Sequence, residues 1–123
     1  MIPLTPAQRY FLYRPATDMR KSFNGLSGLV RRELRENPLS GDVFIFVNRR
    51  RDRIKLLVWD RCGFVLYYKQ LQQGTFELPG LPAGAVSHEL KWSDLLLILE
   101  GVELKSVRHR KRFSLTPTGR GKN

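Results

Sequence analysis

Four arginines lie in the short stretch between two apolar runs, at Arg49, Arg50, Arg51 and Arg53. A guanidinium group is permanently charged, and its forked N–H donors fit a phosphate or a guanine edge. A turn between two strands does not require such a cluster, because Asn-Gly or Asp-Gly turns the chain without repulsion among cations. The cluster therefore predicts a contact with a polyanion.

Two structural alternatives remain open for this cluster. A charged loop can keep an apolar sheet from aggregating, although one or two charges suffice for that purpose. Arg53 could instead pair with the adjacent Asp52 and hold the turn. Lys55, one step along the following strand, joins the candidate contacts because a β-ribbon can enter the major groove of DNA and present its cations there.

Two further cations, Arg20 and Lys21, lie where a helix is expected to begin. The helix dipole disfavours positive charge at that end. A phosphate bound to the free N–H groups of the first turn would resolve the conflict, and both residues are therefore candidate nucleic-acid contacts. Pairing with the carboxylate of Asp18, Asp52 or Asp60 is the favoured explanation.

Catalytic patterns are sparse. The two histidines, His88 and His109, lack the spacing of a metal site, and the sequence contains no familiar nucleophile or nucleotide-binding motif. Asp42, Asp52 and Asp60 come near predicted strand ends and could hold the metal ions of a nuclease, which keeps that activity as a third hypothesis. We predict no catalytic residues, no metal and no cofactor.

Positive charge is concentrated at the C-terminal end. The chain has 22 Lys and Arg against 11 Asp and Glu, and residues 105–123 hold seven of the cations and no acid. Such a tail typically binds a polyanion, most often nucleic acid, although a tail that only confers solubility is the alternative. The tail cations that join the predicted contacts are Arg108, Arg110, Lys111 and Arg112.

The sequence favours a cytoplasmic location. No apolar run approaches the roughly 20 residues of a membrane-spanning helix. The N-terminal residues have neither the basic nor the apolar region of a signal peptide. The single cysteine, Cys62, excludes an internal disulfide and suits a reducing compartment. We expect a cytoplasmic protein that joins the nucleoid when bound to DNA and has no membrane partner.

One α+β domain is predicted over residues 1–104, with a partly disordered basic tail over residues 105–123. A short strand is expected within residues 9–14, and the clearest helix spans residues 18–36. Thr17 or Asp18 can cap this helix, and Pro38 prevents it from continuing. Its apolar residues recur on one face; they are Met19, Phe23, Leu26, Val30 and Leu34.

Three apolar runs rich in β-branched and aromatic residues predict an antiparallel β-meander over residues 43–48, 53–60 and 64–71. The second connection is a tight turn in which Gly63 is expected to take a positive φ. Residues 74–79 are expected to add a strand and residues 78–87 to form a loop. A short helix is predicted over residues 93–100, capped by Ser93 and ended by Gly101. The predicted fold is thus a meander packed against one longer and one short helix.

Three blocks of the sequence resemble a known family. They are residues 17–26 ("TDMRKSFNGL"), residues 38–79 with "DRIKLLVWD" near their centre, and residues 95–113. From about Ile2 to Phe113 the chain is similar to the accessory protein TnpB, the second open reading frame product, of insertion sequence sixty-six elements. The RNA-guided nuclease that shares this label is far larger, and nothing in the chain resembles it.

The resemblance implies a bacterial mobile-element protein that assists transposition. In that family the DDE-type transposase is a separate product, and the small protein has no established catalytic activity. We therefore expect a non-catalytic accessory protein whose candidate partners are DNA, including the terminal inverted repeats, and the transposase. The leading hypothesis is DNA binding through the arginine cluster and the tail. The alternative is an interaction module that binds the transposase or another protein of the element.

Overall fold

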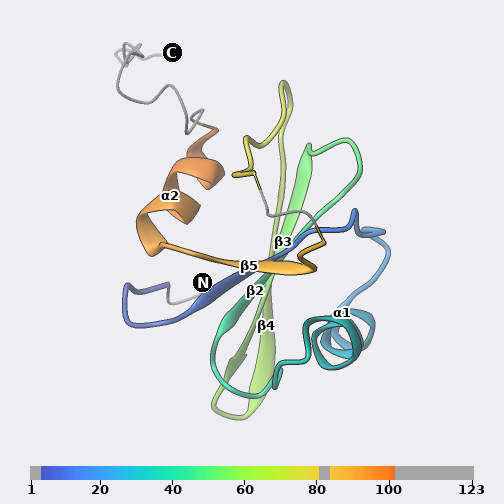
Figure 1. Ribbon diagram of the computed structural model, residues 1–123, viewed down its shortest axis with the longest axis vertical. Helices are drawn as coiled ribbons and strands as arrows, with labels where there is room; N and C mark the ends of the chain where they lie inside the picture. Colours follow the sequence, from blue (N-terminus) through green and yellow to red (C-terminus); the bar gives the residue numbers. More distant parts are fainter. Residues whose placement is uncertain (1–3, 81–83, 102–123) are drawn as a thin grey trace.

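Five strands form one mixed sheet in the computed structural model, which describes residues 4–80 and 84–101 (Figure 1). The strands are β1 (Tyr10–Tyr13), β2 (Val43–Val47), β3 (Arg53–Asp60), β4 (Gly63–Gln70) and β5 (Ser87–Leu90). Their order across the sheet is β4-β3-β2-β1-β5. The antiparallel β2–β3–β4 meander confirms the prediction, and β1 runs parallel to β2. This parallel pair is possible because the long connection from β1 to β2 contains a helix.

Both faces of the sheet are covered, which explains why the strand sequences are almost continuously apolar. Along β3, Ile54 and Leu56 point to one face, where α2 (Trp92–Glu100) and Phe76 pack. Leu57 belongs to the other face, which is covered by α1 (Phe23–Leu29) and the π-helical turn η1 (Val30–Leu34). Figure 1 shows α1 and α2 on opposite sides of the sheet. The α+β fold is as predicted.

The first helix starts later than predicted, at Phe23 rather than near residue 18. The Asp18 carboxylate accepts the N–H of Arg20, two residues ahead, and so closes a local turn instead of capping a helix. The N–H of Thr17 donates to the Val47 carbonyl at 2.9 Å, which keeps that residue extended beside β2. The predicted cap at Thr17 or Asp18 is therefore wrong. Arg20 and Lys21 precede the helix and do not oppose its dipole.

The apolar face of this helix is confirmed in its C-terminal part. Leu26, Val30 and Leu34 are buried, whereas Phe23 is 43% exposed. Met19 packs against the same cluster from the loop before the helix. The helical segment ends at Arg35, which takes the left-handed conformation with φ of 58°.

Three local predictions in the second half of the chain are wrong. Residues 74–79 form no strand; instead Phe76 fills the core on the α2 face, and β5 follows and pairs with β1. The positive φ of the β3–β4 turn lies at Arg61, not at Gly63, which is the first residue of β4. Lys91, not Ser93, occupies the N-cap of α2. The predicted end of α2 at Gly101, with φ of 79°, is confirmed.

Within the described residues, no helix is both long and apolar enough to cross a bilayer. The tail, including the four cations predicted as DNA contacts, lies outside the described residues. The predicted boundary between residues 104 and 105 lies there as well.

Candidate nucleic-acid interface

Asn48 organises the connection between β2 and β3, residues 48–53, which we call the arginine loop. Its side-chain Oδ1 accepts the backbone N–H groups of Asp52 and Arg53, both at 3.0 Å. Its Nδ2 donates to Asp52 Oδ1 at 2.7 Å, and this hydrogen bond is the main reason that the pKa of Asp52 is lowered. Asp52 is thus bound to Asn48, and no ion pair joins it to Arg53.

Backbone hydrogen bonds fix the arginine loop from both sides. Within the loop, the N–H of Arg51 donates to the Asn48 carbonyl at 3.0 Å. The segment after β4 then donates to the loop: Phe76 N–H to the Arg51 carbonyl at 2.6 Å, and Leu71 N–H to the Asp52 carbonyl at 2.8 Å. Arg51 takes a left-handed φ of 59°, which is uncommon for a residue other than glycine. The loop is held by its backbone and Asn48, so its arginine side chains are not needed to shape it.

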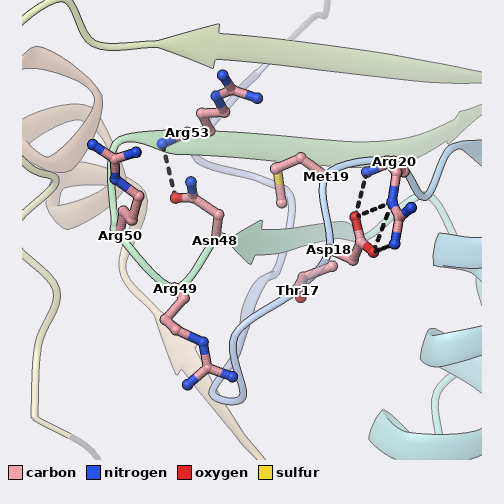
Figure 2. A pocket seen from close by; sticks show the side chains of 8 residues that line it. All are labelled: Thr17, Asp18, Met19, Arg20, Asn48, Arg49, Arg50 and Arg53. Atoms are coloured by element: carbon pink, nitrogen blue, oxygen red, sulfur yellow. Dashed lines mark hydrogen bonds and ion pairs between the residues drawn. The ribbon is translucent and has the colours of Figure 1, made fainter.

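The loop faces residues 17–20 across an open pocket of about 510 Å3. We call this hollow the arginine pocket; its lining residues are Thr17, Asp18, Met19, Arg20, Asn48, Arg49, Arg50 and Arg53. Figure 2 shows the guanidinium groups of Arg49, Arg50 and Arg53 spread in different directions around the loop. Arg20 therefore meets three arginines of the cluster that lie far away in the chain, whereas Lys21 does not line the pocket.

Arg20 is paired with Asp18, as the sequence reasoning favoured. The Arg20 Nη2 to Asp18 Oδ2 distance is 2.7 Å, and Nε also donates to the carboxylate (Figure 2). The hydrogen bonds from Arg20 lower the pKa of Asp18 to about 2, so the carboxylate stays charged at neutral pH. The Arg20 side chain is nevertheless 91% exposed, and its guanidinium remains accessible to a second partner.

Lys55 lies beneath the segment that carries this pair. It is buried, with 5% of its surface exposed. Its Nζ donates to the backbone carbonyls of Met19 at 2.8 Å and Lys21 at 2.7 Å, and it lies 4.6 Å from the centre of the Tyr68 ring. Burial lowers the pKa of Lys55. In this position the ammonium group holds residues 19–21 against the sheet.

The other arginines of the pocket form no ion pair with a described acid, although the charges of Arg50 and Arg53 contribute to the lowered pKa of Asp52. Among the described residues only two ion pairs form, Arg9–Glu89 and Arg20–Asp18. Arg49, Arg50 and Arg53 thus have no described carboxylate within 4.0 Å. Three arginines that form no ion pair, on a fixed loop, make a surface suited to a phosphate chain.

Arg51 points to a different hollow from its neighbours. It lines a pocket of about 190 Å3 together with Arg14 and residues of the 78–80 segment. The cluster is therefore divided between two surfaces. Sequence reasoning missed Arg14, which follows β1, and Asn48, whose position before the three arginines was the available signal.

Among the described residues, no group of three His, Cys, Asp or Glu side chains is placed to hold a metal ion.

One family model and two curated relatives match the chain over most of its length. Residues 8–109 match the family model TnpB_IS66, described as IS66 Orf2 like protein. The chain is 30% identical over 110 residues to the uncharacterized protein y4jC of Sinorhizobium fredii, covering 89% of this chain and 92% of the relative. It is 31% identical over 103 residues to the uncharacterized protein y4hO of the same organism, covering 84% of this chain and 88% of the relative. No solved structure matches the chain.

Proposed function

The chain belongs to the IS66 Orf2-like family of insertion-sequence accessory proteins, and from this premise we propose that it binds the element's DNA through the arginine pocket. In this role it assists the separate transposase of the element. The candidate target is the terminal inverted repeats, where a transposition complex must assemble. The basic tail adds sequence-independent attraction to the phosphate chain.

The observation that carries the proposal is the geometry of the arginine loop. Asn48 and backbone bonds from residues 71 and 76 fix the loop, while Arg49, Arg50 and Arg53 have no described acidic partner. Because the loop is already fixed in the free protein, ligand binding does not carry the entropic cost of ordering a flexible loop. Cations that repel one another in the free protein gain most from a polyanion that neutralises them together.

The loop also lies at the tip of the hairpin formed by β2 and β3. β2 and β3 pair from Val43↔Val58 to Val47↔Ile54, and the arginine loop joins their ends. This hairpin is not a free two-stranded ribbon, because β1 and β4 flank it in the sheet. The loop is therefore presented at the end of the five-stranded sheet, where its arginines can bond to phosphates through paired N–H donors. Arg20 approaches from the facing side of the pocket and can contact a neighbouring phosphate.

The test compares two double variants of equal charge. Arg49→Ala/Arg50→Ala removes two cations from the pocket, and Arg31→Ala/Arg32→Ala removes two exposed cations from η1, which does not line it. We expect the first variant to bind DNA more weakly, and the slope of log K against log[salt] to flatten by up to about 0.9 for each phosphate that is no longer neutralised. The control should change affinity little at 0.15 M salt, because distant exposed charges are screened.

Thermal melting of both variants shows whether each remains folded. Equal weakening by the two double variants would show that only net charge matters. Unchanged DNA binding by the folded pocket variant would contradict the proposal, and transposase binding would then become the leading function.

A further inference from the structure

Tyr68 is a half-exposed aromatic residue beside the arginine pocket. It lies in β4 opposite Lys55, and Arg53 lies opposite Gln70. Side chains alternate along a strand, so Arg53, Lys55 and Tyr68 share the α1 face of the sheet. Arg53 and Tyr68 are therefore diagonal neighbours, at a separation of about 7–8 Å in such pairings. The ring is thus within one nucleotide's reach of a pocket arginine.

The Tyr68 ring is held in place yet open to solvent. The Lys55 ammonium lies 4.6 Å from its centroid, and that ammonium is itself fixed by two backbone carbonyls. Tyr68 nevertheless keeps 48% of its surface exposed, the largest fraction among the exposed large hydrophobic residues of the described chain. Isolated exposed apolar residues are common on proteins. Tyr68 differs because it is an oriented ring diagonally opposite Arg53, which has no described carboxylate within 4.0 Å.

Aromatic rings flanked by cations are the usual platform for unpaired bases. In a duplex the faces of the bases are covered by stacking, so a protein ring can stack only on a base that has left the helix. Arginines beside the ring then hold the phosphates of the same strand.

We propose that the arginine pocket and Tyr68 together bind an unpaired DNA strand, with a base stacked on Tyr68 and the adjoining phosphates on Arg49, Arg50 and Arg53. The inference rests on the proposed DNA-binding function and specifies the form of DNA that the site prefers. Phosphate contacts serve either duplex or single strand, whereas the ring contributes only to the single strand. A site of this kind suits element ends that are opened during transposition.

The first experiment changes the ligand and leaves the protein intact. The full chain is titrated with a fluorescent single-stranded oligonucleotide, with a duplex of the same sequence, and with an abasic single strand that keeps every phosphate. Stacking of one base corresponds to about a 5- to 150-fold gain in affinity. We expect the abasic strand to bind at least about fivefold more weakly than the normal strand. Equal affinities for these two strands would overturn the inference.

The second experiment changes the ring. Tyr68→Leu should weaken single-strand binding at least about fivefold, with duplex binding unchanged, which also shows that the variant is folded. Tyr68→Phe keeps the ring and should retain the single-strand affinity. Leu39→Ala is the control, since Leu39 is 44% exposed and lies before the start of β2, at the opposite end from the arginine loop. Equal weakening of single-strand and duplex binding in Tyr68→Leu would contradict the stacking role.

The two proposals fail in different ways. If neither form of DNA binds the full chain, the proposed function itself is wrong. If duplex binding depends on Arg49 and Arg50 while removal of the bases or the Tyr68 ring has no effect, only the preference for an unpaired strand is wrong.

Discussion

Asn48 is the residue on which the shape of the arginine loop depends. Asn48→Ala removes three hydrogen bonds, two to backbone N–H groups and one to Asp52. We expect the free energy of unfolding to fall by about 1–3 kcal/mol, because half-buried polar groups lose their partners. DNA affinity should also fall although no charge is removed, since the arginines are no longer held in place.

Denaturant unfolding and a salt titration measure these two effects. The matched control is Asn37→Ala, which removes one side-chain hydrogen bond, to the N–H of Leu39, away from the pocket. It should leave DNA affinity unchanged. An Asn48→Ala protein with normal DNA affinity would show that the arginines do not need a fixed loop.

Asp18 gives a pH-dependent contribution to stability whose sign follows from its pKa. Pairing with Arg20 lowers this pKa from 3.8 to about 2 in the folded protein. The unfolded state therefore binds the proton first as pH falls, and the stabilisation, complete above the unfolded pKa, is lost between about pH 4 and pH 2. We expect the difference in Tm between the protein and Asp18→Asn to shrink over this range. A difference in Tm that stays constant from about pH 6 to about pH 2.5 would contradict a lowered pKa of Asp18 in the folded protein.

At the scale of elements, Lys55 connects β3 to the segment before α1. Lys55→Met leaves the Met19 and Lys21 carbonyls without their donor, and we expect the free energy of unfolding to fall by about 1–3 kcal/mol. DNA affinity should fall because Arg20 is displaced, and the salt slope should flatten by up to about 0.9 as the phosphate contact of Arg20 is lost.

The salt slope decides between two roles for Lys55. In a protein that already carries Arg20→Ala, Lys55→Met should leave the slope unchanged, whereas a further flattening by about 0.9 would indicate a direct phosphate contact of Lys55, as the sequence suggested. Lys69→Met is a suitable control, because its ammonium donates to the Leu99 carbonyl of α2 and does not line the pocket. That variant should be less stable without a change in the slope.

The elements that the sequence predicts are those specified by neighbouring residues. The meander follows from three apolar runs and two short connections, and Gly101 ends α2 because a left-handed φ suits glycine. The pairing of β1 with β5 joins segments far apart in the chain, and β5 has only four residues, so local patterns do not reveal it. The helix start was misplaced because Asp18 can cap a helix or bond to Arg20, and the sequence alone does not choose between them.

The sequence predicted the charged residues of the candidate site but not the contacts that hold these residues in place. The arginine cluster can be read directly from the sequence, and the predicted meander places the cluster at the tip of a hairpin. The meeting of Arg20 with this loop depends on contacts between distant segments, among them Thr17 with Val47 and Lys55 with Met19. Lys55 illustrates the difference, since its charge suggests a surface contact while its place in a sheet covered on both faces buries it.

At the scale of the whole molecule, positive charge is divided between residues 1–104 and the tail, residues 105–123. The tail holds seven of the 22 Lys and Arg residues, whereas all 11 acids precede residue 105. Counterion release makes such charge effective on any nucleic acid, with no dependence on sequence. We therefore expect the tail to supply affinity and the arginine pocket to supply the preference for particular DNA.

Truncation after Glu103 tests this division, because it removes the tail and keeps every described element. We expect unchanged thermal stability, a flatter salt slope, and weaker binding to element ends and to unrelated duplexes by the same factor. A full-length variant in which all seven tail cations are replaced by Gln is the matched control for charge, and it should reproduce most of the weakening. If truncation instead abolished binding to element ends while unrelated duplexes still bound, the tail would be the part that recognises the sequence. Recognition by the pocket would then be limited to the phosphate chain and the unpaired base.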